Sequence, residues 1–558
     1  MFAGLPEETC RELAARTEPV ELAAGEWLFR AGDPADALYV VRSGRLEVVG
    51  ETEDGRETVL RVLQRGAALG ELALLARSPR SASVRARRDS ALLRLGHQDF
   101  SSLLAARPEF ALGLSRNLGR QLQESRARAI PRPLTPALVA LVPTVAGAPT
   151  DQVSHRLAAA LGAWESVAGL DGDEEGDRAD LLDRAEREHG RVLLTASHPD
   201  PADPWTAFCL RHADRVLAVA PADDAPGRRD GLRGSDLVVW GWRPGGGRAV
   251  GWAEAVSPRA VHLVAAGDEG AGIERLARRL AGRALGVVLS GGGARGLAHI
   301  GVLEALEAAG VSIDRVGGCS MGALVGGMLA AGRGPAEIAE RMRAEFVERN
   351  PLNDYTVPLA ALARGRKAQA MLERVFEDAA IEELHREFFC VSCDLLSAEL
   401  FVHRRGLLRD AVGASACLPG IVPPVSAAGR LLVDGGVLNN LPVQQMAERG
   451  EGPVIAVDVS SRFQPPAVAG RRPRARPLRA ALVGWDHPLP SFQETLVRTV
   501  ALGSIDTAAA AQRHADVTIL PEVSGFGLMR FDRLDEIRAA GRQAAAEALA
   551  GQPAPLAP

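Results

Sequence analysis

Residues 285–322 read LGVVLSGGGARGLAHIGVLEALEAAGVSIDRVGGCSMG, and this stretch indicates the fold of the C-terminal half of the chain. The apolar segment Leu285–Leu289 leads into three consecutive glycines, and a helix-like run follows from Leu297 to Ala308. A strand, a glycine turn and a helix in this order are typical of an α/β sheet. The exposed amides of the turn can hold a phosphate or the oxyanion of an acyl transfer, and a tight turn without ligand is the third interpretation.

The same stretch ends in a second motif, Gly318-Cys319-Ser320-Met321-Gly322, which fits the G-x-S-x-G nucleophile elbow. A sharp turn between a strand and a helix there presents the serine hydroxyl, and the small glycines avoid steric clashes. A single motif of this kind arises often by chance in a chain with 59 glycines. Its position about 25 residues after the triglycine turn is much more specific.

A nucleophilic serine needs a base, and the sequence offers an aspartate more readily than a histidine. The downstream histidines lie in charged, proline-rich or polar surroundings; they are His385, His403, His487 and His514. The segment Val433-Asp434-Gly435-Gly436 instead places an aspartate at the end of an apolar run, followed by two glycines. We expect Asp434 to reach the serine, although an ordinary Asp-Gly turn would have the same sequence. We expect His299 to be a packed, hydrogen-bonded side chain.

The three motifs together resemble the patatin-like phospholipase family, which uses a Ser–Asp dyad. The resemblance covers about residues 283–465 and includes the block 414–420 that precedes the aspartate. It implies that Ser320 attacks an ester carbonyl and that Asp434 accepts the serine proton. It also implies an oxyanion hole at the glycine turn, with the arginine bracing the loop; the residues concerned are Gly291, Gly292, Gly293 and Arg295. The implied substrate is a phospholipid or lysophospholipid, and no cofactor or metal ion is expected for catalysis.

The N-terminal part carries a different pattern, in which short strands framed by helices alternate with turn signals at Gly32 and Gly44. Glu71 can accept a ribose hydroxyl and Arg80 can pair with a cyclic phosphate, while two charged residues on a β-roll surface are the simpler interpretation. Their spacing resembles the phosphate-binding cassette of cyclic-nucleotide-binding domains over about residues 5–125. The resemblance implies a regulatory nucleotide, cAMP in preference to cGMP, at Gly70, Glu71, Arg80 and Ser81.

Residues 137–282 alternate apolar segments with helical ones, which suggests a small parallel α/β layer. Its candidate strands are 137–142, 191–195, 215–219, 236–240 and 261–264. The first of them is not followed by the Gly-Lys-Ser/Thr ending of a phosphate-binding P-loop. This region therefore offers no catalytic residues.

Composition limits the functional classes. The formal net charge of −5 gives no reason to expect nucleic-acid binding, and six scattered cysteines favour a reducing cytosol. The pair Cys390 and Cys393 lies in an apolar segment without a second pair, so a structural interpretation is favoured over a metal site. The arginine-rich run 471–479 is expected to be a solvated loop, with a peripheral contact to anionic lipid at the inner face of the plasma membrane as the alternative. The expected location is cytoplasmic.

The expected architecture is multidomain, with an N-terminal β-roll at 1–130, an α/β region of unknown role at 137–282 and a patatin-like α/β/α sandwich at 283–550. The combination resembles bacterial relatives of the neuropathy target esterase family, and it predicts a serine-dependent acyl-ester hydrolase regulated by cyclic nucleotide. The alternative is a non-catalytic nucleotide sensor that binds lipid or a protein partner. A nucleotide-dependent transcription factor is disfavoured, because an α/β pattern stands where a helix-turn-helix should follow.

Overall fold

The computed structural model describes residues 7–51, 57–107, 110, 114, 135–174, 176–227, 229–246, 248–356, 361–427, 429–460 and 505–550. The chain forms two compact units. The first comprises Met1–Pro221 and Arg229–Val238, and the second comprises Ala222–Arg228 and Val239–Pro558. No helix in the described part of the chain is both long enough and apolar enough to cross a membrane. The predicted arginine-rich loop at 471–479 lies outside the described residues.

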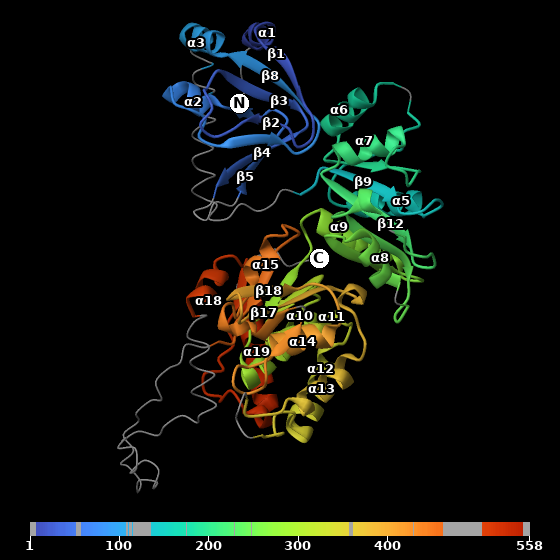
Figure 1. The fold of residues 1–558 in the computed structure, drawn as a ribbon, viewed down its shortest axis with the longest axis vertical. Coiled ribbons are helices and arrows are strands. Elements are labelled where there is room, and N and C mark those ends of the chain that lie inside the picture. The colour runs from blue at the N-terminus through green and yellow to red at the C-terminus, as the bar shows by residue number, and fades with distance from the viewer. Residues whose placement is uncertain are drawn as a thin grey trace. The chain divides into compact units, whose positions relative to one another are not determined.

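The first unit begins with two four-stranded antiparallel sheets of order β1-β8-β3-β6 and β2-β7-β4-β5 (Figure 1). Their strands are β1 (Glu18–Leu22), β2 (Trp27–Phe29), β3 (Ala37–Ser43), β4 (Arg45–Glu51), β5 (Glu57–Gln64), β6 (Ala68–Leu69), β7 (Ser83–Ala86) and β8 (Ser90–Gly96). Leu22 and Leu92 from one sheet and Leu46 and Val84 from the other belong to one buried cluster. The two sheets therefore share a core, and the predicted β-roll is confirmed.

Three helices accompany these sheets: α1 (Glu7–Ala15), α2 (Glu71–Ala76) and α3 (His97–Ala106). Phe100 and Leu103 of α3 pack in a second buried cluster with Phe110 and Leu114. The sequence predicts a helical run from about residue 98 to 128, and α3 forms its start. Beyond residue 107 only residues 110 and 114 of that run lie within the described part.

A parallel layer follows in the first unit, where strands alternate with helices. These elements are β9 (Leu138–Pro143), α5 (Thr150–Leu161), β10 (Val167–Leu170), α6 (Arg178–Glu188), β11 (Arg191–Thr195), α7 (Pro204–His212) and β12 (Arg215–Pro221). The four strands pair in parallel in the order β10-β11-β9-β12, and every residue of β9 is buried. The predicted α/β alternation is confirmed here, and β10 is an additional strand. It was not predicted because its short sequence, Val-Ala-Gly-Leu, has no distinctive pattern.

A buried network of charges joins the β-roll to this parallel layer within the first unit. Arg45 pairs with Asp214 at 3.1 Å, and their side chains are only 5% and 1% exposed. Arg88 donates to Glu186 at 2.6 Å and to the carbonyl of His212 at 3.0 Å. Because a buried charge that loses its partner is strongly destabilising, these pairs hold the two parts of the unit together.

The alternation continues toward the second unit. The elements are η1 (Asp230–Leu232), β13 (Asp236–Trp242), α8 (Arg248–Val256), β14 (Ala260–Ala265) and α9 (Glu269–Leu280). The strands predicted at 236–240 and 261–264 correspond to β13 and β14.

An eight-stranded mixed sheet forms the centre of the second unit, with the order β19-β20-β17-β16-β15-β21-β22 and with β18 paired to β17. The strands are β15 (Gly286–Leu289), β16 (Arg315–Gly318), β17 (Glu387–Asp394), β18 (Glu399–His403), β19 (Val425–Ala427), β20 (Arg430–Asp434), β21 (Val454–Val457) and β22 (Val517–Ile519). Strands β17, β16, β15, β21 and β22 run parallel, whereas β18, β20 and β19 pair antiparallel.

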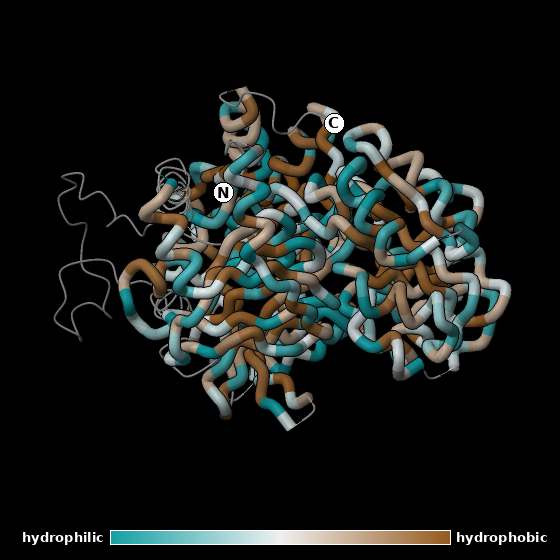
Figure 2. The backbone as a smooth tube through the Cα atoms, turned by 90° about the horizontal axis from the view of Figure 1, so that it is seen from above, coloured by the Kyte–Doolittle hydropathy of each residue, from teal (hydrophilic) through white to brown (hydrophobic). Residues whose placement is uncertain are grey.

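Helices and short helical turns surround this sheet. They are η2 (Gly293–Leu297), α10 (Ala298–Ala308), α11 (Met321–Ala330), α12 (Pro335–Met342), η3 (Arg343–Arg349), α13 (Arg366–Phe376), η4 (Ile381–Glu383), α14 (Leu408–Ser415), η5 (Gly435–Val437), α15 (Val443–Ala447), α18 (Ile505–Gln512), η6 (Phe531–Arg533) and α19 (Leu534–Ala550). In Figure 2 hydrophobic and hydrophilic stretches alternate along the tube, as amphipathic strands and helices require.

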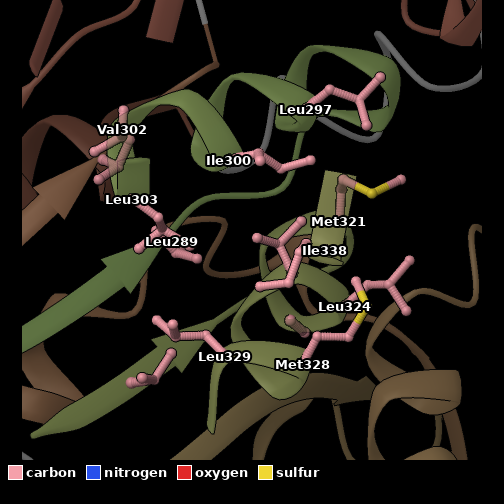
Figure 3. Close-up of a cluster of buried hydrophobic side chains, with 14 of the residues drawn as sticks. Leu289, Leu297, Ile300, Val302, Leu303, Met321, Leu324, Met328, Leu329 and Ile338 are labelled. Carbon is pink, nitrogen blue, oxygen red and sulfur yellow. The ribbon is translucent and has the colours of Figure 1, made fainter. Parts of the chain in front are cut away.

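The two faces of the central sheet pack into different buried clusters. In β15, Val287 and Leu289 belong to the cluster shared with α10, α11 and α12, part of which Figure 3 shows. Val288 between them belongs to the cluster that contains Val443 and Met446 of α15. Because successive side chains of a strand point to opposite faces, both faces of the sheet are covered by helices. The predicted α/β/α sandwich is confirmed.

Helices α10 and α19 approach each other with glycine at the contact. A Cβ atom on Gly301 would overlap the backbone of Arg538, and one on Gly541 would overlap the backbone of Ala298. Glycine therefore permits a direct backbone contact, which brings the segment before α19 close to the triglycine turn.

Candidate active site

Ser320 lies on the sharp turn between β16 and α11, with φ 53° and ψ −118°. A positive φ is costly for a residue with a side chain, and such strain is typical of a nucleophile elbow. The turn is tight because its glycines touch backbone. A Cβ on Gly318 would lie 2.6 Å from Gly322, and one on Gly322 would overlap the carbonyl of Leu289. The spacing of the motif is thus explained by steric contacts.

Asp434 ends β20 and is 2% exposed. Strand β17 pairs with β16 through residues 387–390 and with β20 through residues 392–394. Because β18 takes the other edge of β17, β16 and β20 share one edge, and their carboxyl ends face each other there. Oδ1 of Asp434 accepts a hydrogen bond from the amide of Gly436 at 2.8 Å and from the thiol of Cys319 at 3.6 Å. The two glycines after the aspartate are required, since a Cβ on Gly435 would overlap the carbonyl of Val391.

Burial dominates the proton affinity of this carboxyl group. It raises the pKa of Asp434 to about 6, while hydrogen bonds from the Ser320 side chain, the Gly436 amide and the Cys319 thiol act in the opposite direction. The predicted serine and aspartate side chains are therefore brought together. Oδ2 of Asp434 is buried and has no hydrogen-bond partner of good geometry among the described residues. A carboxylate with a free lone pair beside a hydroxyl can accept its proton.

The triglycine turn lies directly against the serine. A Cβ on Gly291 would come within 3.1 Å of Cβ of Ser320, so this glycine allows the close approach. The amide of Gly291 donates to the carbonyl of Asn440 at 3.2 Å, and Nδ2 of Asn440 donates to the carbonyl of Gly291 at 3.1 Å. The amides of Gly292 and Gly293 have no acceptor within the described ranges. These two donors remain available to an oxyanion.

Arg295 is buried, and its guanidinium group is directed at main-chain carbonyls. Nε donates to the carbonyl of Phe526 at 2.8 Å and an Nη atom donates to that of Ser524 at 3.2 Å. The amide of Ala294 donates to the carbonyl of Leu528 at 2.8 Å. The segment 524–528 thus supports the turn from outside the predicted motifs.

Two residues at the site were not identified from the sequence. Oγ of Ser415 is fully buried and accepts the amide of Ser320 at 3.0 Å. Asn440 holds Gly291, as described above, and a Cβ on Gly436 would lie only 3.0 Å from its Oδ1. Ser415 lies in the block 414–420, which contributes to the resemblance, whereas Asn440 follows the Asp-Gly-Gly motif. The available signal was a polar residue inside an apolar stretch.

His299 is a packed, hydrogen-bonded side chain, as predicted, and the surroundings of Cys390 and Cys393 fit the structural role predicted for them. Nε2 of His299 contacts the carbonyl of Ser290 at 2.8 Å, and burial lowers the pKa of this imidazole to about 4. Burial raises the pKa of the thiols of Cys390 and Cys393, so neither is a ready thiolate. No group of three or more His, Cys, Asp or Glu side chains is placed to hold a metal ion in the described part of the chain.

The predicted nucleotide-binding residues gather at the start of α2. Gly70 is its N-cap with φ 87°, and Glu71, its first residue, is 3% exposed. Arg80 is also 3% exposed, and Ser81 beside it is exposed. A Cβ on Gly70 would overlap the Arg80 guanidinium group, so Gly70 leaves room for that side chain. The structure brings Gly70, Glu71 and Arg80 together.

The guanidinium group of Arg80 is held by acceptors of the protein itself. It donates to the carbonyl of Ala37 at 2.8 Å and to Oδ1 of Asp36 at 3.1 Å. It also lies 4.2 Å from the ring centre of Phe29. Asp36 pairs in addition with Arg94 at 2.9 Å. A cyclic phosphate at Arg80 would therefore compete with the carboxylate of Asp36.

Two parts of the chain match known families. The patatin-like phospholipase family matches residues 287–447, and the cyclic nucleotide-binding domain matches residues 19–107. An uncharacterized NTE family protein of Mycobacterium tuberculosis (strain CDC 1551 / Oshkosh) is 36% identical over 99% of this chain and 95% of its own length. The chain belongs to the NTE family.

Other NTE relatives are longer proteins. A lysophospholipase of Coccidioides immitis is 28% identical over 94% of this chain and 40% of its own length. Patatin-like phospholipase domain-containing protein 6 of Mus musculus is 31% identical over 78% of this chain and 38% of its own length. This NTE family member is a carboxylic ester hydrolase of the patatin-like phospholipase type with an N-terminal cyclic nucleotide-binding domain.

Proposed function

We propose that the protein hydrolyses an acyl ester of a phospholipid or lysophospholipid, with Ser320 as nucleophile and Asp434 as the general base. The substrate class is supported by the lysophospholipase of Coccidioides immitis, which is similar over 94% of this chain. The buried carboxyl group of Asp434 beside the Ser320 hydroxyl is the single observation that carries the proposal. Catalysis needs no cofactor or metal ion in this scheme.

The reaction follows from the groups around the serine. Asp434 accepts the hydroxyl proton as Oγ of Ser320 attacks the ester carbonyl, which forms a tetrahedral intermediate. The free amides of Gly292 and Gly293 stabilise its oxyanion, while Gly291 and Arg295 hold the turn in position. Collapse of the intermediate transfers the proton to the departing alcohol and leaves an acyl-enzyme. Water, deprotonated by Asp434, then releases the fatty acid.

A fluorophosphonate probe tests the nucleophile directly, because it reacts only with an activated serine. We expect covalent labelling that maps to Ser320 and is lost in Ser320→Ala. Labelling at another serine, or none in folded protein that hydrolyses esters, contradicts the proposal.

The pH dependence of hydrolysis should report the base. Asp434 must be ionised to accept a proton, so protonation below its raised pKa removes activity. On a soluble ester we expect kcat/KM to be constant above pH 7 and to fall about tenfold per pH unit below pH ~6. An acid limb near pH 4, the range of an ordinary aspartate, contradicts the assignment of a buried aspartate as the base.

The regulatory part of the proposal concerns the β-roll. A cyclic nucleotide, cAMP in preference to cGMP, binds at Gly70, Glu71, Arg80 and Ser81 and alters hydrolysis. The buried pair of Arg45 and Asp214 supports transmission, because it ties the β-roll to the parallel layer of the same unit. Hydrolysis measured with cAMP, with cGMP and without nucleotide tests this part, and equal rates in all three contradict it.

The competition at Arg80 gives a specific expectation. Replacing Asp36 by asparagine removes a carboxylate that pairs with Arg80 at 3.1 Å and is 55% exposed. Because the Asp36 carboxylate is half exposed and solvent screens it, the pair is worth about 1 kcal/mol, and we expect Asp36→Asn to bind cAMP about two- to fivefold more tightly. Asp99→Asn, which removes a half-exposed carboxylate of α3 that lies 3.7 Å from Arg16, is the matched control. Calorimetric titration is the measurement, and weaker binding by Asp36→Asn contradicts the competition.

The domain organisation proposed with this function has three parts: residues 1–130 for the nucleotide, 137–282 of unassigned role and 283–550 for hydrolysis. The proposed location is the cytoplasm, with peripheral access to the inner face of the plasma membrane, and nucleic acid is not a partner. Cell fractionation with and without high salt tests the location, since peripheral binding to anionic lipid is salt-sensitive.

A further inference from the structure

A cavity of about 140 Å³ lies in the second unit, at the opposite end of β16 and β17 from Ser320. Its wall includes Asp314 just before β16 and Glu387 at the start of β17. The start of β14 and one side of α9 complete it. We call it the amino-end cavity, because parallel strands begin there, and it belongs neither to the serine site nor to the β-roll.

The amino-end cavity is strongly basic. Seven arginines and only three carboxylates line it, a surplus of four positive charges in a chain whose formal net charge is −5. The carboxylate of Asp314 is occupied, since Arg278 outside the wall binds both of its oxygens at 3.0 and 2.7 Å. Glu387 pairs with Arg279 at 2.7 Å. Glu451, outside the wall, pairs with Arg259 and Arg279 at 2.7 Å each, and these carboxylates together still leave cations of the wall unneutralised.

Three of the lining arginines have no carboxylate partner in the described part of the chain. Arg386 donates only to the main-chain carbonyls of Ile313 and Leu329, at 2.9 and 2.8 Å. Arg405 donates to the carbonyl of Pro258. Arg275 on α9 is half-buried and makes no hydrogen bond or ion pair with any described residue. A guanidinium group without a partner in a cavity is available to a ligand.

The electrostatics of the cavity favour an incoming anion. Burial lowers the pKa of Arg275, and burial together with the charge of Arg275 lowers the pKa of Arg386. Burial and the two guanidinium groups likewise lower the pKa of His385. All three shifts have the direction expected where cations are desolvated and repel one another. A bound anion would relieve both effects.

We propose that the amino-end cavity is a binding site for a phosphate group, with Arg275 and Arg386 as its principal ligands. Guanidinium groups bind phosphate oxygens in bidentate fashion, and a phosphate has enough oxygens for two of them. The size fits, because a cavity of ~150 Å³ admits a molecule as large as benzene. Since Arg275 lies on α9 and Arg386 lies just before β17, the phosphate would bridge these elements.

Inorganic phosphate tests the site on the full-length protein by calorimetry at constant ionic strength. We expect saturable binding that Arg275→Ala weakens about tenfold or more, the loss of a charge-assisted contact. Arg366→Ala, at the exposed start of α13, should leave the binding unchanged. Absence of binding, or equal binding by Arg275→Ala and the original protein, overturns the proposal.

Thermal unfolding separates a ligand site from a structural role of Arg275. Without phosphate, Arg275→Ala should melt close to the temperature of the original protein, because the half-buried side chain makes no hydrogen bond or ion pair with a described residue and its attraction to Asp314 is opposed by burial and by Arg278. Phosphate should raise the melting temperature of the original protein and not that of the variant. A variant that melts lower and still responds to phosphate contradicts the assignment.

The phosphate could belong to a soluble ester or to a lipid head group, and two further measurements distinguish these sources. Glycerol phosphate that competes with inorganic phosphate, without flotation on vesicles, identifies a soluble ester. Flotation on phosphatidylcholine vesicles containing phosphatidic acid, lost in Arg275→Ala, identifies a head group.

Discussion

Ser320→Ala is expected to abolish hydrolysis, with kcat reduced by about four orders of magnitude or more. The hydroxyl at this position is the only protein group in the proposed mechanism that forms a bond with the acyl carbon. The fold should persist, because Ser320 is 8% exposed and its amide, which donates to Ser415, is retained by alanine. The variant should therefore still bind substrate. Initial rates on a short-chain ester and on lysophosphatidylcholine provide the measurement.

Ser312→Ala, at an exposed position of the same unit, is the matched control and should retain full activity. A Ser320→Ala protein that unfolds like the original and still hydrolyses either ester at more than a hundredth of its rate would falsify the nucleophile assignment.

Asp434→Asn is expected to lower kcat about 10³- to 10⁴-fold and, at the same time, to stabilise the protein. The amide cannot accept a proton, although it keeps the shape of the carboxyl group. The expected gain in stability of the variant follows from the sign of the pKa shift, because the pKa of Asp434 in the folded protein is about 6 and the ordinary value is 3.8. Between these values the folded state holds the proton more tightly, so stability falls as pH rises and stays reduced above pH 6.

The size of this stabilisation is limited by the shift, which corresponds to at most ~3 kcal/mol at pH 7. Asparagine carries no charge and avoids that cost. At pH 7, Asp434→Asn should therefore melt several degrees higher than the original protein, in which Asp434 is ionised. The gain should vanish at pH 4, where both side chains are neutral. Asp410→Asn, an exposed control on α14, should change neither activity nor melting temperature. A loss of stability in Asp434→Asn at pH 7 contradicts the environment described for this carboxyl group.

The sequence predicted the elements whose causes are local. The elbow at Ser320 is recognisable because Gly318 and Gly322 are required by contacts only a few residues away or on the adjacent strand. The same holds for the glycines after Asp434. Short strands between turn signals likewise indicated the β-roll, and apolar runs that alternate with helices predicted most strands of the parallel layer. Local sterics and burial leave a periodic signal, and a single sequence is sufficient to detect it.

Features that depend on distant contacts could not be predicted. Which amides of the triglycine turn remain available depends on Asn440. This residue hydrogen-bonds to Gly291 although the two are 149 positions apart in the sequence. The contact of Arg295 with Phe526 spans 231 positions. The amino-end cavity brings α9 together with the residue before β17, and neither segment has a distinctive motif. Such contacts arise from tertiary packing, so they cannot be predicted from composition or from the spacing of motifs.

The support of the triglycine turn by segment 524–528 has a consequence for protein synthesis. The serine, the aspartate and the glycines are all translated before this segment, which α19 then secures through its glycine contact with α10. A nascent chain that still lacks these residues holds every reactive group but no rigid oxyanion pocket. A chain truncated before residue 524 is therefore expected to lose ester hydrolysis although it contains both Ser320 and Asp434.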